Sequence, residues 1–129
     1  MEKKPGGYGM LQQETLRRTI EKIPDYKTFL TVEEMDESSK RLAEEYPDVV
    51  TLFKCGKSRD GHPLYCLKIG EGSKNAIFYG CPHPNEPIGA MMLEAFSRIL
   101  AEDSQLRREL DYTFYLIKSW DVDGTKLNE

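Results

Sequence analysis

The stretch from Asn75 to Leu100 restricts the fold more than any other part of this sequence. It opens with a short, continuous apolar run that ends at Cys81 and is typical of a strand covered on both faces. A loop with prolines at positions 82, 84 and 87 follows, and prolines at this density exclude regular helix or strand. From Ile88 to Leu100, apolar residues recur at helical spacing. The stretch therefore predicts a buried strand, a stiff loop and a helix in succession.

The flanking sequence predicts three further strands. Two runs with β-branched or alternating apolar residues, 49–55 and 63–69, are separated by turn-forming residues and predict a β-hairpin. Another strand is expected over 112–117, parallel to the strand before the proline-rich loop because a helix connects the two. Asp121 to Gly124 has turn composition and is expected to form a turn.

Helical periodicity and capping residues predict the remaining elements. Thr31 followed by Glu34 is a capping-box signature at the start of one helix. Glu94 and Arg98 stand four apart and are expected to pair on the outer face of another. Helices are expected over 11–23, 31–46, 88–100 and 106–110. The order of elements predicts the α/β class, with a mixed β-sheet and flanking helices.

Composition excludes several classes of partner. The chain has 129 residues, a length that suits one domain, and its formal net charge is -4. An acidic balance of this kind predicts no nucleic-acid partner. Because no apolar run reaches the ~18 residues that a membrane-spanning helix needs, no membrane span is predicted.

Cysteine usage indicates a reducing compartment. Cys55, Cys66 and Cys81 are odd in number, form no close pair and lie in apolar, strand-like runs, so each is expected to be a buried free thiol. The first ten residues contain no apolar signal core. A cytoplasmic location is therefore expected.

His83 and Glu86 are the candidate metal ligands. They lie in the proline-rich loop at the carboxyl end of a predicted strand, which is where open α/β sheets bind ligands. A neutral imidazole and a carboxylate both suit zinc, and a tight turn brings residues three apart to one ion. The same two residue types also occur in ordinary turns, so the pair alone leaves a metal site and a structural turn both open.

Three segments in order resemble the zinc carboxypeptidase family of metallopeptidases. Residues 56–65 are similar to that family's first hairpin, typically GxSxxGRPI, with His62 in place of the usual Arg. Residues 83–86 match the family's HxxE motif, and residues 120–124 fall where the family usually carries NPDG. Trp120-Asp121-Val122 departs from the Asn-Pro pair of that last motif.

The resemblance implies an N-terminal portion of a zinc-carboxypeptidase-like (phosphorylase/hydrolase-like) domain over 25–129, preceded by an extension with a short helix over 1–24. It implies zinc as cofactor, His83 and Glu86 as the first two ligands, and hydrolysis of the C-terminal bond of a peptide substrate. The family's third ligand, general-base Glu and carboxylate-binding Arg all match positions beyond this sequence. No catalytic or substrate-binding residue is therefore assigned, and the 129-residue chain is expected to be inactive by itself.

Two alternatives stay open. Zinc amidohydrolases that deacylate N-acyl amino acids share the HxxE motif, often as HGNE, and residues 83–89 resemble that form. A non-catalytic α/β domain that binds a partner is the other alternative.

Strands missing after residue 117 are expected to leave a sheet edge exposed, which predicts self-association through that edge.

Overall fold

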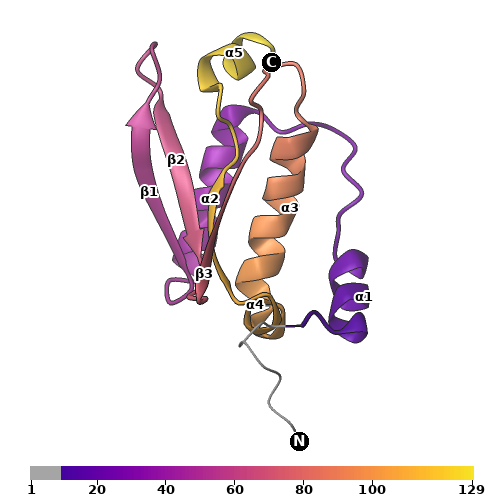
Figure 1. The fold of residues 1–129 in the computed structure, drawn as a ribbon. Coiled ribbons are helices and arrows are strands. Elements are labelled where there is room, and N and C mark those ends of the chain that lie inside the picture. Colours follow the sequence, from indigo (N-terminus) through magenta and orange to yellow (C-terminus); the bar gives the residue numbers. More distant parts are fainter. Residues whose placement is uncertain (1–9) are drawn as a thin grey trace, which may run out of the picture.

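A computed structural model describes residues 10–129, so residues 1–9 of the predicted extension lie outside the described part of the chain. The helices are α1 (Gln13–Glu21), α2 (Val32–Glu45), α3 (Ile88–Glu102), α4 (Ser104–Leu110) and α5 (Val122–Leu127), and the strands are β1 (Val50–Lys57), β2 (Pro63–Ile69), β3 (Lys74–Tyr79) and β4 (Tyr112–Ile117) (Figure 1). Among the described helices, none is both long and apolar enough to cross a bilayer.

The four strands form one mixed sheet in the order β1-β2-β4-β3. β1 and β2 pair antiparallel, which confirms the predicted hairpin, and β2 continues antiparallel onto β4. β3 and β4 pair in parallel over their whole length, from Lys74 opposite Tyr112 to Tyr79 opposite Ile117. Both parallel strands therefore end at the same edge of the sheet, where the proline-rich loop begins.

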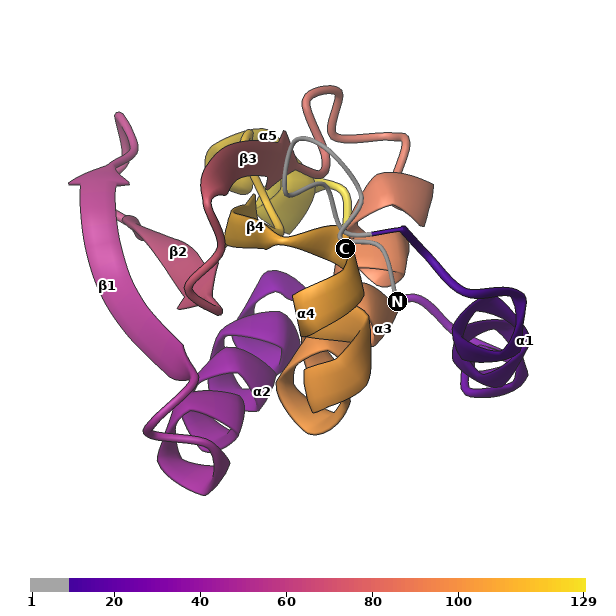
Figure 2. The same ribbon diagram turned by 60° about the horizontal axis from the view of Figure 1, so that its bottom comes forward.

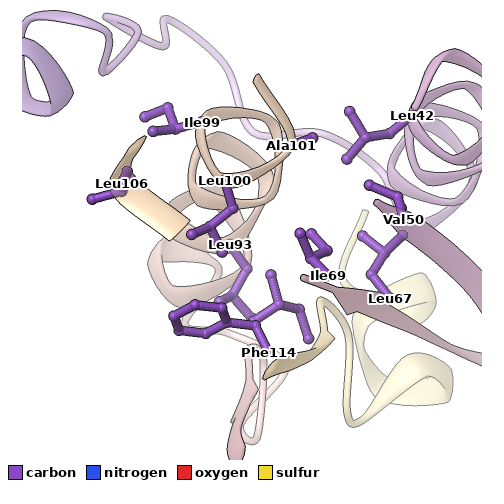
Figure 3. Packing of buried hydrophobic residues seen from close by; sticks show 11 residues of the cluster. Leu42, Val50, Leu67, Ile69, Leu93, Ile99, Leu100, Ala101, Leu106 and Phe114 are labelled. Atoms are coloured by element: carbon purple, nitrogen blue, oxygen red, sulfur yellow. The ribbon is translucent and has the colours of Figure 1, made fainter. Parts of the chain in front are cut away.

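Helices α2, α3 and α4 pack against one face of this sheet (Figures 1 and 2). Alternate strand residues point toward these helices, as the two-residue period of a strand requires. The buried apolar cluster between the layers, shown in Figure 3, consists of Leu42, Val50, Leu67, Ile69, Leu93, Ile99, Leu100, Ala101, Leu106, Phe114 and Leu116. The predicted capping box is confirmed at the start of α2, where the Thr31 hydroxyl accepts from the Glu34 amide at 3.1 Å.

The prediction that the strand before the proline-rich loop is covered on both faces is wrong. β3 is an edge strand, and its Ile77 and Tyr79 side chains are 63% and 52% exposed. The composition of an apolar strand does not reveal whether another element covers its faces. This strand presents the open edge on which the predicted self-association depends.

The expected turn over Asp121 to Gly124 is instead the first turn of helix α5. The Asp121 carboxylate accepts from the Gly124 amide at 3.0 Å and thereby caps the helix. Asp is both a turn former and a good N-cap residue, so the composition of this segment fits either structure.

All three cysteines are free, but only Cys66 and Cys81 are buried. Cys55 is exposed because it alternates with Thr51 and Phe53 on the face of β1 that points away from the helices. The expected burial of Cys55 is therefore wrong.

Helix α1 lies beside α3 and α4 and is held by polar contacts (Figure 2). Arg18 forms an ion pair with Asp103 at 3.0 Å, and the Thr15 hydroxyl donates to Glu109 at 2.9 Å. The apolar residues Leu16 and Ile20 are 44% and 57% exposed. These apolar side chains of α1 are therefore not part of the core.

Candidate metal centre

The three segments that carry the family resemblance meet at one end of the molecule. The turn between β1 and β2, the loop from β3 to α3, and α5 all lie at the top of Figure 1. The Asp60 amide in the hairpin turn donates to the Asp123 carboxylate of α5 at 3.1 Å. A Cβ placed on Gly124 would stand 2.9 Å from ring carbons of Pro84, so α5 also abuts the proline-rich loop.

The start of the loop is fixed at Gly80. Its amide donates to the Ile117 carbonyl and its carbonyl accepts from the Trp120 amide, each at 2.8 Å. A Cβ on Gly80 would lie 2.6 Å from the Lys118 carbonyl oxygen and 2.7 Å from the Ala90 nitrogen. Only glycine permits the end of β4 and the start of α3 to approach the loop this closely.

Cys81 continues the fixed part of the loop. Its backbone adopts a left-handed conformation with φ 48°, which is uncommon for a residue with a side chain. The Cys81 carbonyl accepts from the Asp121 amide at 3.0 Å, and the side chain is fully buried. Burial raises the pKa of the Cys81 thiol, so this cysteine acts as a small apolar residue at the base of the loop.

The outer part of the loop is a tight turn. The Glu86 amide donates to the His83 carbonyl at 3.1 Å, which closes the turn between the two candidate ligands. The Pro84 carbonyl accepts from the Asn128 side chain at 3.2 Å. Pro87 then precedes the first residue of α3, and its ring fixes the direction in which the helix leaves the loop.

This turn brings the two predicted ligands together. The His83 Nδ1 atom lies 3.4 Å from the Glu86 Oε2 atom. Their side chains are 71% and 64% exposed, in contrast to the fully buried Cys81 two residues before His83. The loop therefore has a fixed base and presents an imidazole and a carboxylate side by side to solvent.

The spacing of these atoms fits zinc. Ligand atoms about 2.1 Å from a tetrahedral zinc ion stand about 3.4 Å apart. Within residues 10–129, no group of three or more His, Cys, Asp or Glu side chains is placed to hold an ion. His83 and Glu86 would thus supply two of the coordination positions and leave the others open.

Asp123 serves the hairpin turn. A hydrogen bond from the Ser58 side chain, together with the one from the Asp60 amide, holds the pKa of Asp123 below its usual range despite partial desolvation. The nearby charges of His62 and Arg59 act in the same direction. These contacts give Asp123 a structural role and leave His62 at the hairpin, apart from the His83–Glu86 pair.

Sequence reasoning missed a buried ion pair below the loop. The predicted pair of Glu94 with Arg98 is wrong. The Glu94 Oε2 atom instead lies 2.5 Å from the Lys118 Nζ atom. The two side chains are 11% and 6% exposed. Burial lowers the pKa of Lys118, and the Glu94 carboxylate opposes that shift. The only signal in the sequence is a lysine directly after the apolar run of β4, and that signal does not identify a partner.

Comparison with known proteins agrees with this arrangement. The family model described as zinc carboxypeptidase matches residues 35–129. Mouse carboxypeptidase A6 is 28% identical over 123 residues, which cover 88% of this chain and 28% of that protein. Mouse mast cell carboxypeptidase A is 30% identical over 94 residues, which cover 67% of this chain and 22% of that protein.

Solved carboxypeptidase structures share the fold. Bovine thrombin-activatable fibrinolysis inhibitor, in complex with tick carboxypeptidase inhibitor, superposes with a TM-score of 0.73 at 22% identity, over 81% of this chain and 35% of that one. Carboxypeptidase A from Helicoverpa armigera gives a TM-score of 0.64 at 18% identity, over 88% of this chain and 32% of that one. The chain thus spans about a third or less of the length of these relatives. Because the family model matches most of its residues, the chain belongs to the zinc carboxypeptidase family.

Proposed function

We propose that this chain carries the first two zinc ligands of a metallocarboxypeptidase that hydrolyses the C-terminal bond of a peptide. The 3.4 Å approach of His83 Nδ1 to Glu86 Oε2 is the observation that carries the proposal. Both atoms belong to exposed side chains on a loop whose base is fixed by the Gly80 hydrogen bonds. Such a loop holds the two donors near each other before a metal arrives, which lowers the entropic cost of binding.

Each ligand has a distinct part in this proposal. A bound zinc ion would polarise the scissile carbonyl and lower the pKa of a water molecule. His83 would offer its Nδ1 lone pair in the neutral state, and Glu86 would offer a carboxylate oxygen and reduce the net charge of the site. The high exposure of both side chains leaves room for the remaining ligands and for a peptide.

The 129-residue chain is incomplete as a catalyst in this proposal. The described residues place no third metal-ligating side chain beside the pair. Two protein ligands hold zinc weakly, so we expect binding without peptidase activity. The matched family and relatives are carboxypeptidases, which gives no support to the deacylase alternative.

Zinc titration by calorimetry tests the proposal. We expect the chain to bind zinc with a dissociation constant below about 1 mM, which corresponds to a binding free energy of about -4.1 kcal/mol or better. The chain contains two histidines, so His62 provides a matched control. His83→Ala should abolish binding, whereas His62→Ala should leave it unchanged.

Glu86→Gln gives an independent arm of the same test. An amide oxygen is a poorer zinc ligand than a carboxylate, so this variant should bind at least about tenfold more weakly. Absence of binding by the unmodified chain at millimolar zinc would contradict the proposal. Equal loss in His62→Ala would contradict the assignment of His83.

A further inference from the structure

The proline-rich loop with His83 and Glu86, here called the metal-binding loop, runs from Gly80 to the start of α3. Lys118 and Glu94 form an ion pair between the elements that hold its two ends. The loop starts at Gly80, whose two backbone hydrogen bonds go to residues on either side of Lys118, Ile117 and Trp120. The loop ends at α3, on which Glu94 is four residues beyond Ala90. Lys118 therefore touches the start of the loop through its main chain and faces α3 through its side chain.

The Lys118–Glu94 ion pair links the end of β4 to α3. Nζ and Oε2 are 2.5 Å apart, and both side chains are almost fully buried. A third element takes part, because the Ser38 hydroxyl of α2 donates to the other Glu94 oxygen. The charges of Asp36 and Arg98 also act on Lys118. α2, α3 and the end of β4 are thus tied at one point beneath the loop.

We propose that the Lys118–Glu94 pair positions the metal-binding loop by fixing the distance between its two ends, and so keeps His83 and Glu86 at ligand spacing. The inference rests on the function proposed above. Lys118 and Glu94 act through the loop as positioning residues and do not touch the metal. Without the tie, α3 and the end of β4 shift relative to each other, and the loop between them shifts with them.

A purely stabilising role makes a different prediction. A buried ion pair contributes little net stability compared with uncharged side chains of similar volume, because desolvation offsets the attraction. Removal of both charges together should therefore leave the fold intact. If the pair serves only the core, zinc affinity should stay unchanged as well.

The test is the double variant Lys118→Met/Glu94→Gln. It retains the length of both side chains and leaves an amide for the Ser38 hydroxyl. We expect the thermal midpoint to stay within a few degrees and the zinc affinity to fall at least about tenfold, the size typical of groups that orient metal ligands. Lys118→Arg retains the charge, and we expect it to keep the affinity within about threefold of the unmodified chain.

A matched control removes another ion pair at the far end of α3. The variant Arg18→Met/Asp103→Asn loses two opposite charges and retains a helix cap at position 103, since Asn caps as well as Asp. It should bind zinc with unchanged affinity. Should Lys118→Met/Glu94→Gln not fold, Ser38→Ala takes its place, with an expected affinity loss of about threefold.

The possible outcomes separate the two proposals. Zinc binding that is equal in the unmodified chain and in the folded double variant overturns the positioning role alone, as does equal binding in Ser38→Ala where that variant is used. An equal loss in the Arg18→Met/Asp103→Asn control overturns it too. No zinc binding by the unmodified chain overturns the proposed function and the positioning role with it.

Discussion

The two faces of the sheet differ in what covers them. Toward α2 and α3, strand residues such as Ile69 and Leu116 are no more than 1% exposed. On the opposite face and along the β3 edge, Phe53, Ile77 and Tyr79 are between 39% and 63% exposed. One layer of helices therefore supplies most of the apolar burial among the described residues.

The loop that carries His83 and Glu86 lies where these two environments meet. Its base, Gly80 and Cys81, is buried, like the covered face of the sheet. The Gly80 amide donates a hydrogen bond to Ile117 at the end of β4. Its outer residues, His83 and Glu86, are exposed, as the uncovered edge is. The comparison indicates that the covered layer determines loop geometry, while the exposed side remains free to bind.

The largest effect should come from the covered face. Leu100 is fully buried in the core cluster, so Leu100→Ala should lower the free energy of unfolding by about 3 kcal/mol. Ile77→Ala removes a similar side chain from the open edge and should cost less than about 1 kcal/mol. Urea denaturation measures both values, and similar losses would contradict the contrast between the two faces.

A smaller but still large effect is expected at the base of the loop. Gly80→Ala places a Cβ against backbone atoms of Lys118 and Ala90, which cannot move without shifting β4 or α3. We expect a loss of about 2 kcal/mol and weaker zinc binding. Gly56→Ala is the control, since its nearest contact is a side-chain carbon of Leu64 at 3.9 Å. Equal stability of the two variants would show that the base of the loop is not tightly packed.

Asp36 of α2 should make the folding stability depend on pH. Burial raises the pKa of Asp36 from 3.8 to about 6, so the folded state binds a proton more tightly than the unfolded state does. The contribution of Asp36 therefore favours folding below about pH 4 and is lost as the pH rises through about 6. That shift corresponds to at most about 3 kcal/mol, and because Asp36 is only half-buried we expect about 1 kcal/mol.

Asp36→Asn isolates this contribution. The variant should be more stable than the unmodified chain at pH 7 by about 1 kcal/mol, and the difference should shrink toward pH 4. Chemical denaturation at several pH values provides the measurement. A difference that grows as the pH falls would mean that Asp36 is stabilised as a carboxylate instead.

The smallest change in folding stability is expected at the β3 edge. Ile77→Lys should alter the free energy of unfolding by less than about 0.5 kcal/mol, because the side chain is 63% exposed. A lysine at an open edge opposes strand pairing between molecules, so the variant should also self-associate less. Sedimentation at high concentration compares the two proteins, and a clean monomer for the unmodified chain would contradict the predicted association.

Local signals in the sequence predicted most elements. The Thr31–Glu34 capping box, the β1–β2 hairpin and the periodicity of α3 each depend on neighbouring residues, and each appears as expected. The turn between His83 and Glu86 is local as well, although the start of its loop is held at Gly80 by long-range hydrogen bonds. Features determined within a few residues are the ones that a single sequence encodes most directly.

Long-range contacts account for what the sequence did not predict. The local rule paired Glu94 with Arg98, but Lys118, which directly follows β4, forms a buried ion pair with Glu94 instead. Likewise, the apolar run of β3 carries no information about which strand or helix covers it. Cys55 faces solvent because the described helices cover only the other face of β1, which local sequence does not reveal.

A crystal structure of the chain soaked in zinc, with anomalous scattering to locate the metal, tests the central claim most directly. We predict one zinc ion within about 2.0–2.2 Å of both His83 Nδ1 and a Glu86 carboxylate oxygen. A zinc ion bound elsewhere, with the imidazole and carboxylate turned apart, would contradict the account.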